Sequence, residues 1–124
     1  MAQVKALIGN IKGKDGMANV YSTSEIEIGT WNGSTLYRKI FKTTVPTSNG
    51  STTNSVTITC GISYNKVISV YVLNAKPSTT AFSSLGLNGQ SDIFVYSSGN
   101  NIILSNANSF YGGAECYVVI EYIK

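Results

Sequence analysis

The sequence contains no histidine, and this absence excludes most familiar enzyme chemistry. Ser-His-Asp and Cys-His catalysis both need an imidazole, and so do the common zinc sites. Only six Asp and Glu residues are present. The closest pair, Glu25 and Glu27, fits a solvated strand face better than a glycosidase pair. No Asp-x-Asp calcium loop or Gly-rich phosphate loop occurs either. We therefore predict that the protein is not an enzyme, with no catalytic residues, cofactor or metal.

Charge is scarce as well: charged residues make up 12% of the chain, against a usual ~25%. The net charge is +3, but the basic residues are scattered, which argues against nucleic acid as a partner. No apolar run reaches the ~20 residues that membrane insertion requires, and residues 1–10 lack the apolar segment of a signal peptide. We expect synthesis in a cytoplasm without export, and burial of a polar, weakly charged surface in an assembly or its use outside a cell.

Cysteine is limited to Cys60 and Cys116. One disulfide between them is an alternative, but two cysteines do not form a disulfide framework. Each lies in a strand-like run and shares its parity with apolar neighbours. The pattern favours two buried, unreactive thiols.

From residue 20 onward the pattern predicts β-structure. Residues 25–28 alternate polar and apolar side chains, Asn32-Gly33 is a preferred hairpin turn, and residues 36–41 form a second β-prone run. Turn residues separate the later runs, which favours an all-β, antiparallel β-sandwich or jelly-roll-like domain. The other expected elements are a loop at 46–54, strands at 55–62, 66–75, 92–96, 101–104 and 114–123, a turn at 97–100, and a connection at 77–89 with Phe82, Leu85 and Leu87 tucked against the body.

Two of these strands are apolar on both faces. In 67–73, Val72 lies on one face, while Tyr71 and Leu73 lie on the other, and 117–123 behaves in the same way. A sandwich strand with one solvated face alternates cleanly. A second cover is therefore expected, either loops of the same chain or a neighbouring subunit. The low charge favours the subunit.

Residues 21–42 also carry a family resemblance. The segment resembles one in phage and prophage fibre proteins, where relatives often have Asp-Gly-Lys-Pro at the turn instead of residues 32–35 here. Residues 13–16, Gly-Lys-Asp-Gly, resemble the junction of shaft and head in such fibres, and residues 121–124 resemble their ends. The matching residues of the main segment are Tyr21-Ser22-Thr23, Glu25, Ile28-Gly29-Thr30-Trp31, Gly33 and Leu36-Tyr37-Arg38-Lys39.

The resemblance implies the head domain of a tail or capsid fibre. It implies a homotrimer, with residues 1–16 as a connector to the shaft and other virion proteins, and residues 17–124 as the head. Localisation in the virion and adhesion to a bacterial surface glycan follow from the same resemblance. Residues 46–112 match only in general β character. The alternative is a monomeric carbohydrate-binding, lectin-like module of a bacterial surface protein.

Aromatic residues beside turns are the candidate receptor contacts, because aromatic rings stack on sugar rings. Each also has a structural alternative: Trp31 would cap the core at a hairpin end, and tyrosines often border subunit interfaces. The candidates are Trp31, Tyr64, Phe110 and Tyr111.

Overall fold

The computed structural model describes residues 20–78, 81–83, 93–107, 109 and 111–124, and they form an all-β domain. The predicted connector, residues 1–16, lies outside this range, as do Leu85, Leu87 and Phe110. None of the helical segments in the described part has the length and apolar character needed to cross a membrane. The elements are β1 (Ile26–Trp31), β2 (Ser34–Thr44), β3 (Asn54–Thr59), η3 (Tyr64–Lys66), β4 (Val67–Ser78), β5 (Ala81–Ser83), β6 (Ile93–Ser98), β7 (Asn101–Asn106) and β8 (Glu115–Tyr122).

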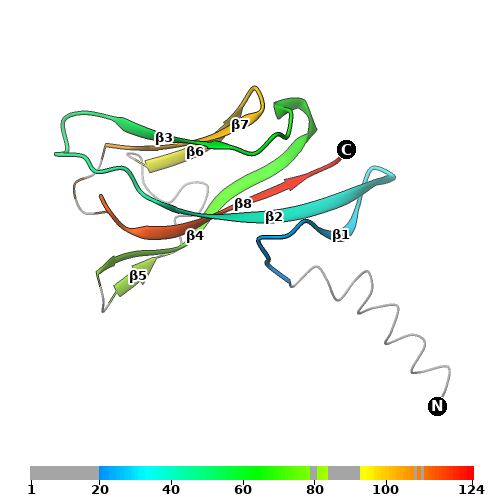
Figure 1. Cartoon of the computed structure of the whole chain (residues 1–124), viewed down its shortest axis with the longest axis horizontal. Helices are drawn as coiled ribbons and strands as arrows, with labels where there is room; N and C mark the ends of the chain where they lie inside the picture. The colour runs from blue at the N-terminus through cyan, green and yellow to red at the C-terminus, as the bar shows by residue number, and fades with distance from the viewer. Residues whose placement is uncertain (1–19, 79–80, 84–92, 108, 110) are drawn as a thin grey trace, which may run out of the picture.

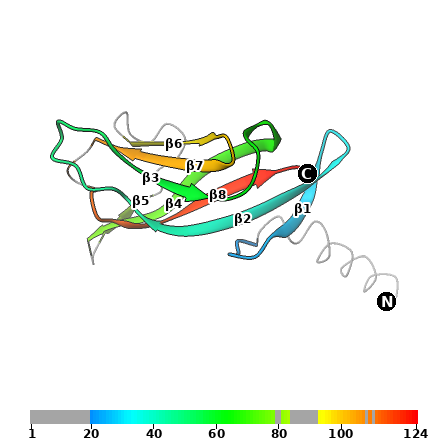
Figure 2. The same ribbon diagram turned by 45° about the horizontal axis from the view of Figure 1, so that its top comes forward.

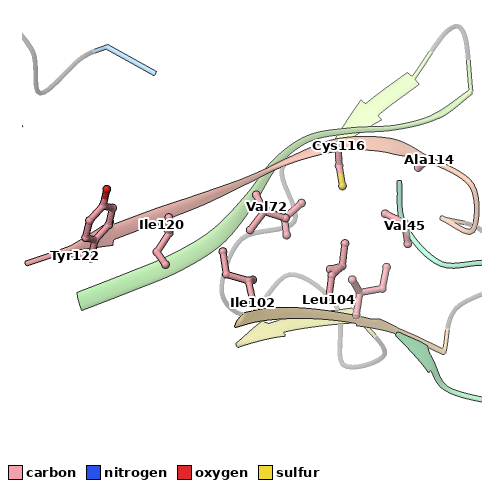
Figure 3. Packing of buried hydrophobic residues seen from close by; sticks show 10 residues of the cluster. Val45, Val72, Ile102, Leu104, Ala114, Cys116, Ile120 and Tyr122 are labelled. Carbon is pink, nitrogen blue, oxygen red and sulfur yellow. The ribbon is translucent and has the colours of Figure 1, made fainter. Parts of the chain in front are cut away.

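The strands form two antiparallel sheets that lie one over the other (Figures 1 and 2). The five-stranded sheet has the order β1-β2-β8-β4-β5, and the three-stranded sheet has the order β3-β7-β6. The core lies between the sheets, where Val72 and Ile120 face Ile102 and Leu104 (Figure 3). Each such side chain contributes about 1.5–3 kcal/mol when it leaves water. The predicted β-sandwich is confirmed at the level of two packed antiparallel sheets.

Both predicted hairpins are confirmed, and their turns contain the expected residues. Asn32 and Gly33 have φ angles of 48° and 83°, the left-handed pair that a two-residue hairpin turn of the primed type requires. Gly99, with a φ of 58°, lies in the turn between β6 and β7. A side chain at these glycines would meet no neighbouring atom, so conformation alone explains them.

In the middle of the five-stranded sheet, side chains alternate between the core face and the outer face as predicted, with one local exception. Val72 pairs with Val118 across the ladder between β4 and β8, and both are buried on the core face. A bulge between Val67 and Ser69 places Val67 opposite Tyr122, so Val67 packs against the core. Strict alternation along 67–73 puts Val67 on the same face as Tyr71 and Leu73, and this prediction is wrong. Period two fails where a strand gains a residue.

The predicted end of the strand 66–75 and the predicted connection 77–89 are wrong. β4 continues through Pro77 to Ser78, and a further strand, β5, lies inside the predicted connection 77–89. Pro77 is tolerated because the β4–β8 and β4–β5 ladders both shift register between Leu73 and Ser78.

The two cysteines are free and differ in environment. Cys116 is fully buried in the core, where burial and the neighbouring charge of Glu115 raise the pKa of its thiol to about 11. β3 ends at Thr59, so Cys60 lies just beyond the strand and is half-buried. The prediction of a buried thiol is right for Cys116 and wrong for Cys60.

Candidate functional site

One end of the sandwich brings together the β1–β2 turn, the segment before β4, the β6–β7 turn and the C-terminal end of β8 (Figure 1). Gly61, with a φ of 74°, redirects the chain after β3. Its backbone NH donates to the Asn100 carbonyl at 2.9 Å, and the Tyr64 NH donates to Gly99 at 2.8 Å. The Ile123 NH donates to the Lys66 carbonyl at 2.9 Å. Backbone hydrogen bonds therefore fix this end from both sheets.

A cavity of about 330 Å³ lies at this end, and we call it the end pocket. Lys39 and Tyr122 contribute to it from positions in register with the core face of the five-stranded sheet. The segment Cys60–Ser63 and Ile123 supply further lining. Its charged residues are Glu25, Lys39, Lys66 and Lys124.

Glu25 is held by two donors that line the same pocket. The Lys124 ammonium lies 2.6 Å from its Oε1, and the Tyr122 hydroxyl donates to its Oε2. Burial raises the pKa of Glu25, but these hydrogen bonds outweigh it, so its pKa lies below the ordinary value. Burial and the bond to Glu25 raise the pKa of Tyr122, so this phenol stays protonated. The carboxylate is therefore ionised and satisfied at neutral pH.

Two lysines of the end pocket are without such a partner. Lys39 lies with its ammonium 5.2 Å from the Phe41 ring centroid, and no described carboxylate lies within ion-pair distance of Lys39 or Lys66. Three ammonium groups thus surround one carboxylate, and that carboxylate is already bound to Lys124. The end pocket is positively charged and suited to an anion.

One predicted receptor contact lies in the segment that borders the end pocket, although it does not line the cavity itself. Tyr64 is 63% exposed and lies in η3, between the lining residues Ser63 and Lys66. Trp31, at the end of β1, is 47% exposed, so it does not cap the core. Tyr111 packs against the core cluster from the segment between β7 and β8, and it does not line the end pocket. The candidates therefore do not form one site.

The five-stranded sheet has an outer face, which points away from the core. An ion pair and the segment before β1 cover part of this face. Arg38 and Glu121 form a salt bridge of 2.7 Å with little exposure, and the Tyr71 hydroxyl donates to the same carboxylate at 3.1 Å. The Arg38 guanidinium lies 4.2 Å from the Tyr21 ring centroid and donates to the Val20 carbonyl at 3.1 Å. Residues before β1 thus contact this face.

An apolar groove of about 170 Å³ lies on the same outer face. Val119, on β8, is fully buried there, and Tyr21 lines the groove from the segment before β1. The backbone NH of Ile40 donates to the Ser22 carbonyl at 2.9 Å and holds this segment against β2. A segment of the same chain therefore covers part of the second apolar face that the sequence predicted. The groove residues are Tyr21, Ile40, Leu73, Tyr117 and Val119.

The outer face of the three-stranded sheet differs, because β3, β6 and β7 contain no charged residue. Phe94 and Tyr96 stand two residues apart on β6 with ring centroids 5.9 Å apart, and they are 48% and 43% exposed. Opposite them, Ser105 and Ser55 share a hydrogen bond of 2.7 Å. We call this surface the aromatic face. It consists of Ser55, Thr57, Thr59, Phe94, Tyr96, Ser98, Asn101, Ile103 and Ser105.

Sequence reasoning missed both the aromatic face and the end pocket. Side chains along β6 alternate between the two faces of the sheet, with Ile93 in the core and Phe94 and Tyr96 on the outer face. This alternation was the signal in the sequence that could have located the exposed rings. The end pocket had no local signal, since Glu25 and Lys124 are 99 positions apart. Nowhere in the described ranges do three Cys, Asp or Glu residues gather as metal ligands would.

Comparison with known proteins adds no relative: no family model, no curated protein and no solved structure matches the chain. The resemblance of residues 21–42 to fibre proteins stays a prediction.

Proposed function

We propose that the chain is the head domain of a phage virion fibre, of the tail or the capsid. In this proposal it is non-enzymatic, assembles as a homotrimer and displays its loops to a bacterial surface. The resemblance of residues 21–42 supports this function, and the way the chain passes back and forth between the sheets supports a jelly-roll-like description. Residues 1–16 would connect it to other virion proteins.

The aromatic face carries the proposal. Monomeric proteins seldom expose adjacent large rings on a sheet face without charges, because such a surface favours association. Each ring removed from water contributes about 1.5–3 kcal/mol, and no ion has to be desolvated along with Phe94 and Tyr96. A trimer that buries this face leaves the end pocket and its loops available for adhesion. Three copies would then turn weak contacts into useful avidity.

The end pocket supports adhesion rather than hydrolysis. Glycoside hydrolysis commonly requires two carboxyl groups, one of them with a raised pKa. Glu25 is the only carboxylate side chain among the described lining residues, and its pKa is lowered. Glu27 is exposed on β1 and does not line the cavity.

The mass in solution tests the trimer. Light scattering after size exclusion is measured for residues 1–124 and for a chain that begins at Met17. A mass of three chains for both is expected, because the interface is placed in the β-domain. A trimer lost on truncation would make residues 1–16 the assembly element. A single chain at micromolar concentration in both samples would overturn the trimer.

The alternative is a monomeric carbohydrate-binding module, and the same two rings are the observation that favours it. Phe94 and Tyr96 present two neighbouring, half-exposed rings with centroids 5.9 Å apart, and exposed rings also suit stacking on sugars. A monomer whose binding to glycans is lost in Phe94→Ser would favour the module over the fibre head.

A further inference from the structure

We propose that the end pocket binds the acid group of an anionic saccharide, a carboxylate or a phosphate, through Lys39 and Lys66. This inference rests on the proposed adhesive function and specifies the class of ligand. The chemistry is that of two ammonium groups that form no ion pair with a described carboxylate, in a cavity whose one carboxylate side chain, Glu25, is already bound to Lys124 and Tyr122.

Glu25 sets the arrangement of the pocket. It binds the Lys124 ammonium at 2.6 Å and accepts the Tyr122 hydroxyl, so both of its oxygens are occupied. The Lys124 ammonium also lies 4.4 Å from the Tyr37 ring centroid. The charge of Lys124 is thereby paired with Glu25, and Lys39 and Lys66 are left to bind an incoming anion.

The backbone around these lysines is rigid. Lys39 lies within the ladder between β2 and β8, where it pairs with Ile120. The Lys66 backbone NH donates to Ser63 at 2.9 Å and its carbonyl accepts from Ile123. Lys39 and Lys66 therefore project from fixed positions on two different parts of the chain. A site of this kind loses little backbone entropy when a ligand binds.

The size of the end pocket and the residue beside it point to a sugar rather than a bare ion. A volume of about 330 Å³ lies at the small end of the range of ligand sites and exceeds what one phosphate needs. Tyr64, next to the pocket, is 63% exposed and offers a ring for the C–H face of a sugar. The Ser63 side chain, also at the pocket, can bond a hydroxyl.

Binding of three small probes tests this inference on the full chain. Methyl β-D-glucuronide, glucose 1-phosphate and methyl β-D-glucoside are titrated, and Kd is measured by NMR. We expect at least one anionic probe to bind about tenfold more tightly than the neutral glucoside, because charge-assisted hydrogen bonds are the stronger ones. The anionic probe that binds more tightly identifies a carboxylate or a phosphate as the acid group. Raising the salt concentration should weaken only the anionic probes.

Substitutions locate the binding. Lys66→Gln and Lys39→Gln should each weaken the anionic probe about tenfold and leave the glucoside unchanged. Lys42→Gln is the matched control, since Lys42 is exposed on the outer face and pairs with Glu115 at 3.4 Å. Equal affinity of all three probes, or equal Kd values for Lys66→Gln and Lys42→Gln, would overturn the inference.

Adhesion to bacterial cells separates this inference from the proposed function. Adhesion of the wild-type chain that persists in Lys66→Gln and in excess probe would overturn the inference and leave the fibre head standing. Absence of adhesion and of the trimer, together with lysine-dependent binding of an anionic probe, would overturn the fibre head and keep the site.

Discussion

The two outer faces of the sandwich occupy equivalent positions, but they differ in how their apolar and aromatic side chains are covered. On the five-stranded sheet, the ion pair of Arg38 and Glu121 is satisfied by Tyr71 and contacted by the segment before β1. On the three-stranded sheet, Phe94 and Tyr96 remain open to solvent among hydroxyl-bearing residues. The first face is covered in part by the chain itself, whereas the described residues leave the rings of the second uncovered. Apolar character in the sequence is therefore not by itself evidence of an interface; what matters is whether the chain covers it.

The largest expected effect is on assembly. Replacing Phe94 and Tyr96 together by serine removes the apolar contacts of the aromatic face, each worth about 1.5–3 kcal/mol. The mass by light scattering should fall from three chains to one. Tyr64→Ser, which removes a more exposed ring outside the aromatic face, should keep the proposed trimer. If the double variant remained trimeric, the aromatic face would not be the interface, and the apolar groove would become the next candidate.

The next effect is on the free energy of unfolding and concerns the other face. Arg38→Met leaves the carboxylate of Glu121 nearly buried without its cation, so the free energy of unfolding should fall by about 3 kcal/mol. The measurement is a urea titration of the chain that carries Phe94→Ser and Tyr96→Ser, so that assembly does not contribute. Lys42→Met breaks the exposed pair with Glu115 and should cost within about 1 kcal/mol. Similar losses for both would mean that the Arg38 pair is not effectively buried.

A smaller effect distinguishes the two sides of the three-stranded sheet. The Ser97 hydroxyl, on the side that faces the core, is buried without a hydrogen-bond partner among the described residues. Ser97→Ala should therefore raise stability, by up to about 1 kcal/mol. Ser105→Ala on the aromatic face removes the bond to Ser55 and should lower stability by about 1 kcal/mol. Thermal unfolding of both variants measures whether each change raises or lowers stability. A lower stability of Ser97→Ala would contradict the conclusion that its hydroxyl lacks a hydrogen-bond partner.

The smallest expected effect is on the pH dependence of stability. The three-stranded sheet contains no carboxylate side chain, so this effect is expected from carboxylates on the side of the five-stranded sheet, such as Glu25. The folded pKa of Glu25 lies below its ordinary value of 4.5, so its stabilising contribution is present above that pH. It is lost as the pH falls through the folded pKa. Glu25→Gln should flatten the decline of the unfolding midpoint between pH 7 and pH 3. Glu27→Gln, two residues further along the chain and outside the end pocket, should retain the wild-type decline.

Local patterns in the sequence predicted the hairpins and the faces of the central strands. Asn32-Gly33 specified a two-residue turn, and the alternation around Val72 placed that residue in the core, because both signals depend on neighbours in the chain. Val67 was misplaced since a bulge is a property of two paired strands. β5 was missed because Pro77 reads as the end of a strand.

The candidate site was less predictable from the sequence. Tyr64 was chosen as an aromatic residue in a turn, and the structure places it beside the end pocket. The lysines of the pocket come from β2, η3 and the segment after β8, so only the strand register and the Ile123–Lys66 hydrogen bond bring them together. A contact across such separations has no periodicity to detect.

The position of β8 also governs how the domain can be made. β8 is the last of the described strands, yet it lies between β2 and β4 in the middle of the sheet. Arg38 and Glu121, paired across it, are 83 positions apart. A nascent chain that has not yet reached β8 has two unpaired strand edges and an open core, so the domain cannot fold stepwise during synthesis. We therefore expect folding to be slow and cooperative, and chains interrupted before residue 115 to be prone to aggregate.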